Sequence, residues 1–374
     1  FKDGDLIAAT HGRGFYIMDN ISSLEQLSPK VVAGDAYLFK PEPQYRESGG
    51  RGGFGGFSRG AGRGGSPTRA VHPSGENPPS GIAVQYWLKS PGETVTLDFL
   101  DAKGELIHRY STSTVLQPAE TGRGGRGGRG GFGGGAARPA NKAGVNTFTG
   151  WDMRYPDANG FNGMVLWAAS TTGPMAPPGT YRVRLSVDGK QVGTQPLTLL
   201  PDPRLKGVTQ VDYDAQFALA MKIRDKFSAT NDAVKTIRYV LYQLGQREKG
   251  LPAAQKSAFD AAATPLRDSL QSVEDSLYQS QSHAGEDPLN YPIRLNNRIG
   301  ALMGVVASAQ GRPTKQSYEV YDLLSGLIDL QMDRMKAAMK GVGRVNGVLK
   351  SAGLDPVVVK AEEVPGSGSP QPAG

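Results

Sequence analysis

The period of the hydrophobic pattern changes once along this chain, near residue 201, and that change limits what the chain can fold into. Before it, apolar and polar residues alternate, as they do in strands that bury one face. After it, apolar residues recur at spacings of three and four, which is typical of helices with one buried face. The sequence therefore predicts a multidomain protein, β first and then α, and its 374 residues are enough for several domains.

The β part is expected over residues 81–200. Its alternating runs are Ile82 to Leu88, Val95 to Phe99, Leu106 to Tyr110, Gly163 to Ala169, Thr180 to Val187 and Gln195 to Leu200. In the first three runs, the residues that should point into the core include Ile82, Val95 and Leu106. Short strands separated by turns in this way predict a sandwich of two sheets.

Two details within residues 81–200 resemble immunoglobulin-like sandwiches. Pro178-Gly179-Thr180-Tyr181 is similar to the tyrosine corner of that fold, in which the phenol of Tyr181 would bond back to the backbone. Asp188-Gly189 supplies the two residues that a type I′ hairpin favours. The order of these signals, with Trp151-Asp152 ahead of them, resembles the immunoglobulin-like module of the flagellar hook-cap protein.

Four helical stripes follow, over residues 217–244, 259–277, 293–306 and 321–342. The first is expected to be one long helix or a kinked pair. Four stripes with short connections predict an antiparallel four-helix bundle over residues 201–355. The remaining residues, 356–374, end in a Pro- and Gly-rich run and are predicted to be a flexible tail.

Two segments are rich in Gly and Arg: an insert over residues 47–80, ahead of the β part, and a loop over residues 118–145 within it. They hold five Arg-Gly-Gly triplets, and their eight arginines exceed the whole formal net charge of +7. Arginine forks and interleaved phenylalanines could bind RNA phosphates and bases. The simpler interpretation is a pair of disordered insertions, because this composition cannot bury enough apolar surface to offset the cost of ordering.

The first residues predict a β-hairpin. Asp5 to Thr10 and Phe15 to Asp19 are β-prone and flank His11-Gly12-Arg13-Gly14. A lone hairpin is at best marginal in water, so this one should need a sheet from elsewhere. The chain also begins at Phe1 instead of Met, and we therefore treat it as the C-terminal piece of something longer.

The run from Ala9 to Ile21, A-T-H-G-R-G-F-Y-I-M-D-N-I, resembles the last blade of bacterial BNR-repeat, sortilin-like β-propeller proteins. That resemblance implies a propeller end over residues 1–28 and an upstream propeller of the same chain as the main partner. It also implies an extracytoplasmic location, periplasmic or secreted. Residues 29–46 contain three Pro residues and are expected to form an extended connector.

Five residues are weak candidates for a binding site. His11 and Arg13 could lie at a propeller mouth, although a turn with one polar cap and one solvated charge is the simpler interpretation and the one we favour. Trp151, Asp152 and Arg154 could stack on and hydrogen-bond a sugar. Their alternative is that Trp151 packs in the core while Asp152 and Arg154 cap a turn.

Catalytic and metal-binding motifs do not occur in the sequence. It lacks H-E-x-x-H, G-x-x-x-x-G-K-[ST] and G-x-S-x-G, its four His residues are scattered, and it has no Cys. We therefore expect no catalytic residue, no metal and no cofactor in this chain. No apolar run approaches the roughly 18 residues of a membrane span.

Three functions remain open at this point. The first is a non-catalytic accessory region of a secreted propeller protein that docks or presents proteins or glycans. The second is part of a glycosyl hydrolase-like enzyme, sialidase-like in its propeller, whose active site lies in blades outside this chain. The third is RNA binding through the Arg-Gly-Gly loops, which we do not favour.

Overall fold

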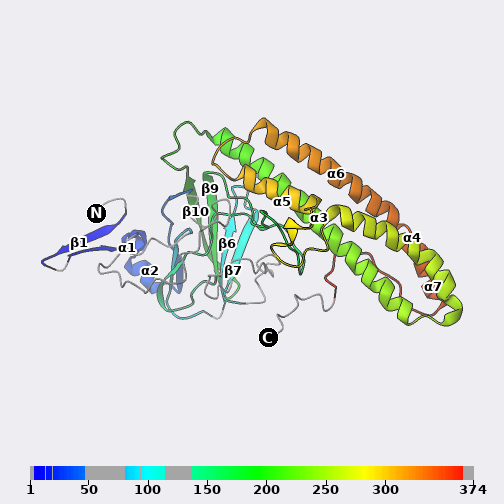
Figure 1. Cartoon of the computed structure of the whole chain (residues 1–374). Coiled ribbons are helices and arrows are strands. Elements are labelled where there is room, and N and C mark those ends of the chain that lie inside the picture. Colours follow the sequence, from blue (N-terminus) through cyan, green and yellow to red (C-terminus); the bar gives the residue numbers. More distant parts are fainter. Residues whose placement is uncertain are drawn as a thin grey trace, which may run out of the picture. The chain divides into compact units, whose positions relative to one another are not determined.

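The computed structural model describes residues 4–12, 14–18, 20–46, 81–92, 94–113 and 137–364. A β-rich N-terminal region with sheets is followed by a helical region with four long helices, in the order that the hydrophobic period predicts (Figure 1). The predicted insert at residues 47–80 and residues 118–136 of the predicted loop lie outside the described residues.

The chain divides into two compact units. Unit 1 comprises Phe1–Glu120, Gly131–Pro156 and Met175–Tyr213, and unit 2 comprises Thr121–Gly130, Asp157–Pro174 and Asp214–Gly374. The division does not follow the predicted boundary at residue 200, because a segment from within the predicted sandwich belongs to the helical unit.

Unit 1 contains two larger sheets. The three-stranded sheet has the order β3-β5-β8 and the five-stranded sheet the order β4-β10-β9-β6-β7. Neighbouring strands are antiparallel except β4 and β10, which are parallel. The strands are β3 Ala36–Leu38, β4 Gln44–Tyr45, β5 Val84–Leu88, β6 Val95–Leu100, β7 Leu106–Ser111, β8 Gly144–Phe148, β9 Gly179–Val187 and β10 Lys190–Leu200.

The two sheets contribute to one hydrophobic core, because alternate residues of each strand point the same way. Its largest fully buried side chains include Tyr86 on β5, Phe99 on β6 and Trp151. One predicted core residue is wrong: Leu106 is exposed and its neighbour Ile107 is buried. The pairing of β6 with β7 shifts its register beside Leu100, and such a shift exchanges the two faces of a strand.

Residues 29–46 are more structured than the predicted extended connector. They begin with the short helix α2, Pro29–Ala33, whose first turn is capped by Ser28; α1, Ser22–Gln26, precedes it. They then supply β3 and β4, each of which pairs with a strand far away in the sequence. Proline breaks helices but is tolerated at the first helical position, which explains the helix at Pro29.

Unit 2 is built on helices α3 Gln210–Lys249, α4 Ala253–Leu277, α5 Leu295–Val306, α6 Lys315–Met339 and α7 Val342–Ser351, together with the 3-10 turn η1 Asp287–Leu289. The first stripe is therefore one continuous helix, and the fourth is divided between α6 and α7. The buried faces share one core, which includes Ile237, Phe259, Ile299 and Ile328.

The strand predicted at Gly163 to Ala169 is wrong. These residues form a loop of unit 2, and helix side chains hold its backbone. The Tyr278 hydroxyl accepts a hydrogen bond from Val165 N at 3.0 Å, and the Asn297 amide bonds to Trp167 N and O. Because helices satisfy the loop's backbone groups, it needs no neighbouring strand.

The start of the predicted flexible tail is also held in place. Residues 355–364, here called the strap, belong to no helix or strand, and Val357 is only 3% exposed. Asn346 on α7 makes two hydrogen bonds to the backbone of Val357, and Gln243 on α3 makes two to Val358. Residues 365–374 lie outside the described part of the chain.

Candidate functional site

The hairpin of β1, Leu6–Thr10, and β2, Gly14–Met18, is the least covered element of unit 1. All ten of its strand residues are exposed, among them Phe15 at 77% and Ile17 at 61%. The register pairs Leu6 with Met18, Ile7 with Ile17 and Ala9 with Phe15. Since successive side chains point to opposite faces, both faces of this hairpin carry large apolar residues.

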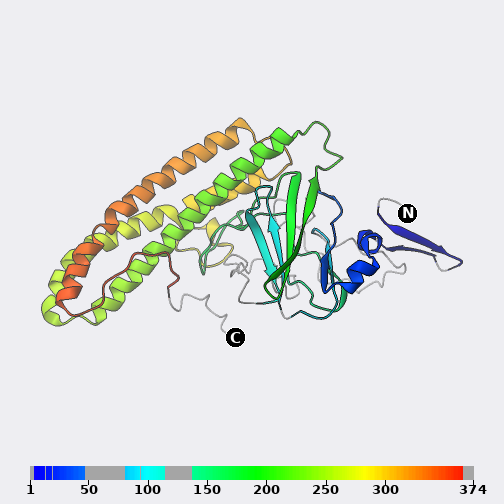
Figure 2. The ribbon, with the colours of Figure 1, turned by 180° about the vertical axis from the view of Figure 1, so that it is seen from behind.

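The hairpin pairs with no other strand in the part of the chain that the structure describes (Figures 1 and 2). It therefore presents the outer edges of both strands as well as its two apolar faces. Its base is fixed, because Ile21 N donates to Gly4 O, Asn20 N donates to Asp5 Oδ1 and Ile21 is buried. Such an element is suited to being covered on both faces by further β-structure.

Of the two candidate residues of the hairpin turn, the structure describes one. His11 lies in the turn and is exposed. Arg13 lies outside the described residues. The structure therefore assigns no ligand-binding contact to His11.

Trp151 lies in the core of unit 1, as the core-packing interpretation predicts. Its ring is 0% exposed, packs 4.8 Å from the ring of Phe99, and donates from Nε1 to Arg154 O at 2.8 Å. A sugar needs an open ring face, and Trp151 has none. Asp152 and Arg154 are close to each other but 4.0 Å apart, a distance that gives only a weak ion pair.

The three motif residues of β9 and its turn have structural contacts. Tyr181 Oη donates to Pro177 O at 2.9 Å, four residues upstream. Asp188 and Gly189, with φ of 50° and 77°, connect β9 to β10, and positive φ at both positions defines a type I′ turn. Asp188 Oδ1 also accepts a hydrogen bond from Thr94 N at 2.6 Å.

The most buried charge cluster of the five-stranded sheet is centred on Asp98, which the sequence analysis did not single out. Arg109 on β7 and Arg184 on β9 each donate two hydrogen bonds to the Asp98 carboxylate, whose side chain is 3% exposed. Burial alone would raise the pKa of Asp98, but the hydrogen bonds and charges of the two arginines outweigh it and lower that pKa. The three residues lie directly opposite one another across adjacent strands, a relationship that requires knowledge of the register.

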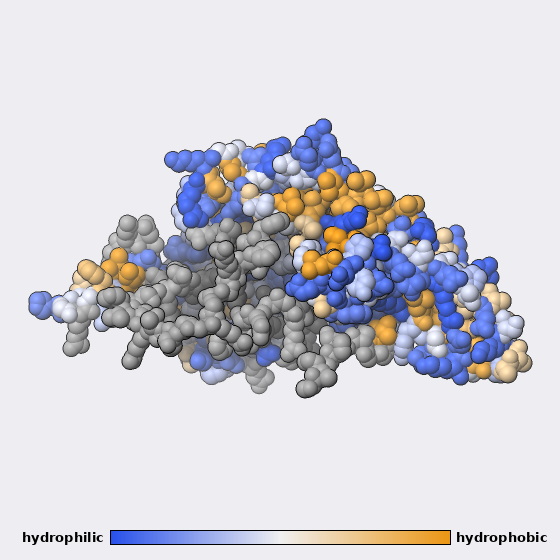
Figure 3. Space-filling view, in the orientation of Figure 1, coloured by the Kyte–Doolittle hydropathy of each residue, from blue (hydrophilic) through white to orange (hydrophobic). Residues whose placement is uncertain are grey.

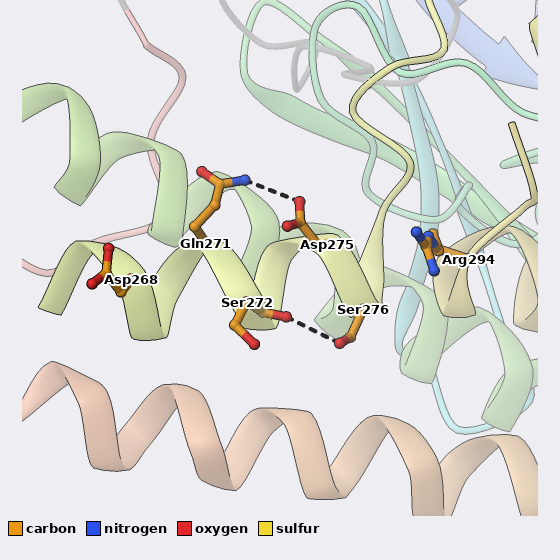
Figure 4. A pocket seen from close by; sticks show the side chains of 6 residues that line it. All are labelled: Asp268, Gln271, Ser272, Asp275, Ser276 and Arg294. Atoms are coloured by element: carbon orange, nitrogen blue, oxygen red, sulfur yellow. Dashed lines mark hydrogen bonds between the residues drawn. The ribbon is translucent and has the colours of Figure 1, made fainter. Parts of the chain in front are cut away.

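A shallow groove lies along α4 in unit 2 (Figure 4). It is lined by Asp268, Gln271, Ser272, Asp275 and Ser276 of α4 together with Arg294 before α5. Gln271 donates to Asp275 at 3.0 Å, and Ser276 donates to the backbone of Ser272 at 3.0 Å. Ser272 also accepts a hydrogen bond from Arg334 of α6 at 3.1 Å, so the two serines and Gln271 are engaged within unit 2.

The space-filling view shows an apolar patch over α5 and α6 (Figure 3). Among the exposed apolar residues of α6 are Val320, Leu323, Leu327 and Leu330, and we call these four the α6 stripe. Their spacing of three, four and three is visible in the sequence, so the pattern could have been found there. The predicted stripe of this helix covers only the neighbouring face, which contains Leu324 and Ile328.

No group of three or more His, Cys, Asp or Glu side chains in the described residues could hold a metal ion. No helix among them combines the length and hydropathy needed to cross a membrane.

Comparison with protein-family models finds no match, and comparison with curated proteins finds none either. Among solved structures, the crystal structure of CopC from Methylosinus trichosporium OB3b aligns with 34% of this chain and 81% of its own, at 18% identity. The TM-score of that alignment is 0.16, so the argument for function depends on this chain's own residues.

Proposed function

We propose that this chain is the non-catalytic C-terminal accessory region of a bacterial β-propeller protein of the BNR-repeat, sortilin-like kind. The observation that carries the proposal is the β1–β2 hairpin, whose strand residues are all exposed and apolar on both faces. In the proposal, the preceding part of the same protein covers this hairpin, and the remaining domains dock or present a protein or a glycan. An extracytoplasmic location belongs to the same proposal.

The two apolar faces favour a propeller over other β-structures. A strand pair added to the edge of a single sheet continues that sheet, and a sandwich then covers one face. In a propeller, each blade packs between two neighbouring blades, so its strands are covered on both sides. Pairs such as Ile7 with Ile17 on one face and Leu6 with Met18 on the other suit that position.

The finer domain assignments are part of the proposal. The shared core of the two sheets and the bond from Tyr181 to Pro177 O support an immunoglobulin-like sandwich, in which a tyrosine corner makes such a bond. The common core of α3 to α6 supports an antiparallel four-helix bundle. Domains of these kinds provide rigid surfaces for binding partners.

The test begins with the coding DNA upstream of Phe1, which should encode repeated β-blades. Amide hydrogen exchange is then measured over residues 4–20, in this chain alone and in the longer protein. We expect fast exchange in this chain and at least about hundredfold slower exchange in the longer protein, because new strands would protect the hairpin amides. Residues 181–187 of β9 are the control and should exchange equally slowly in both. An upstream sequence without β-repeats, or a hairpin that still exchanges fast in the longer protein, contradicts the proposal.

A further inference from the structure

Helix α6 has two apolar faces, and the residues that the structure describes cover only one of them. Leu324 and Ile328 are buried in the core of unit 2. The α6 stripe lies on another face, and its four side chains are between 40% and 63% exposed. Four large side chains exposed to this extent form a patch of a few hundred Å², a size at which patches on soluble proteins often mark interaction sites (Figure 3).

We infer that a second copy of this chain covers the α6 stripe, with the two α6 helices antiparallel about a two-fold axis near residue 325. A two-fold interface must be self-complementary, because the same residues come from both copies. The stripe and its ends read Gln316, Val320, Leu323, Leu327, Leu330 and Arg334. In the antiparallel arrangement Val320 faces Leu330 of the second copy and Leu323 faces Leu327. Arg334, at one end of the stripe, donates to Gln331 and to Ser272 of α4 within its own copy.

Gly326 supports this arrangement independently. It lies near the centre of the 25-residue helix α6, where glycine is less favourable than alanine. A Cβ built at Gly326 meets nothing within 4 Å among the described residues, so packing inside this chain does not require a glycine there. A second helix can pack beside Gly326 without meeting a side chain there, and Gly326 borders the stripe at the proposed axis.

The charges beside the stripe also favour a second copy over a strongly charged partner. Near one end of the stripe Lys315 pairs with Glu319 at 3.2 Å, and near the other Asp333 pairs with Lys336 at 3.1 Å. The antiparallel arrangement brings one such pair next to the other. Each pair is neutral, so neither end repels its counterpart.

The area is also compatible with a dimer. A standard interface buries about 800 Å² per partner, with an apolar centre and a polar rim. The α6 stripe from each copy provides the centre. The neutral ion pairs and the polar ends of the stripe provide the rim.

The first experiment measures the oligomeric state of the full chain by sedimentation velocity over a range of concentrations. Every sample carries Ile17→Lys, which adds a charge to the exposed hairpin and suppresses association through it. We expect a monomer–dimer equilibrium, with Leu323→Glu raising its Kd at least about thirtyfold. Val211→Glu, at a residue of α3 that is 61% exposed, is the matched control and should leave Kd unchanged. A chain that stays monomeric, or a dimer that Leu323→Glu leaves intact, overturns the inference.

The second experiment tests the direction of the helices. The chain has no Cys, so single engineered cysteines can be cross-linked with a short bismaleimide without background. Gly326→Cys should give covalent dimers, whereas Lys315→Cys should not, because antiparallel helices place the two Lys315 positions about 30 Å apart. Efficient cross-linking through Lys315→Cys would overturn the antiparallel arrangement. A failure of the dimer leaves the hairpin's role in the propeller untouched, since the hydrogen-exchange test reads a different element.

Discussion

Asn297 binds both backbone polar groups of Trp167. Its Nδ2 donates to Trp167 O at 2.8 Å, and its Oδ1 accepts from Trp167 N at 2.6 Å. Asn297 comes from α5 and is itself buried, so a helix side chain replaces the neighbouring strand that the loop lacks. Gln243 makes the same two-bond contact with Val358, and Asn346 makes it with Val357.

Replacing Asn297 with alanine should destabilise unit 2 by about 1–3 kcal/mol, because two backbone groups of the loop lose their partners. Urea unfolding followed by far-UV circular dichroism gives the loss, and a red shift of tryptophan emission before unfolding would report release of Trp167. Asn290→Ala, at an exposed residue, should change neither reading. An Asn297→Ala protein as stable as the parent would show that the two hydrogen bonds make no net contribution to the free energy of unfolding.

Ending the chain after Asp355 should destabilise the bundle by about 2–3 kcal/mol, since it removes the buried Val357 and its hydrogen bonds. Ending it after Val364 keeps the strap and should leave stability unchanged. The two truncations are compared by thermal unfolding. Equal stabilities would mean that the strap behaves as the flexible tail that the sequence predicts.

Acid should weaken unit 1 through Asp98. In the folded state the pKa of Asp98 lies below its ordinary value of 3.8. The stability that the ionised carboxylate adds is therefore fully present above that value, and it is lost as the pH falls through the lower, folded-state pKa. We expect Asp98→Asn to cost about 2–3 kcal/mol at neutral pH, because Arg109 and Arg184 lose their shared partner. The variant should also lose less stability than the parent between about pH 4 and pH 2. Parallel stability curves for the two proteins in that range would contradict this account.

Gly189→Ala should destabilise unit 1 by about 1 kcal/mol, because φ at this turn position is 77° and an L-residue is strained there. Gly193→Ala on β10 is the matched control, since a Cβ there meets nothing within 4 Å and φ is not in the left-handed region. The difference between their urea midpoints measures the strain. A Gly189→Ala protein as stable as the control would show that the turn adopts another type.

The sequence predicts those parts of the fold in which one local signal determines the structure. The helical stripes correspond to α3, α4 and α5, and the strands at Thr180 to Val187 and Gln195 to Leu200 correspond to β9 and β10. Asp188-Gly189 lies at the turn between these two strands.

The errors occur where partners distant in sequence decide the outcome. Gly163 to Ala169 alternates like a strand, but the side chains of Tyr278 and Asn297 bind its backbone in place of a neighbouring strand. Leu106 changes face because of one register shift, which no alternating pattern reveals. For Trp151 the sequence offers both core packing and sugar stacking, and the rings of Phe99 on β6 and Tyr181 on β9, both distant in sequence, pack against it in the core.

The hairpin and the α6 stripe differ in how much of each the sequence reveals. The hairpin's β-propensity and turn are local, and its need for a covering sheet follows from its two-strand size. That both of its faces remain open requires the structure. The spacing of the stripe is present in the sequence. The sequence does not show, however, which of the two apolar faces of α6 packs in the core, and only the structure identifies the exposed one.

The amide contacts of Asn297, Gln243 and Asn346 have a consequence for sequence variation. Each contact recognises a peptide group, which every residue except proline provides in full. The side chains at positions 167 and 358 can therefore change while the hydrogen bonds from Asn297 and Gln243 to the backbone are retained. A saturation library should consequently tolerate many substitutions at Trp167 and Val358, reject proline at both, and accept few replacements at the three amides.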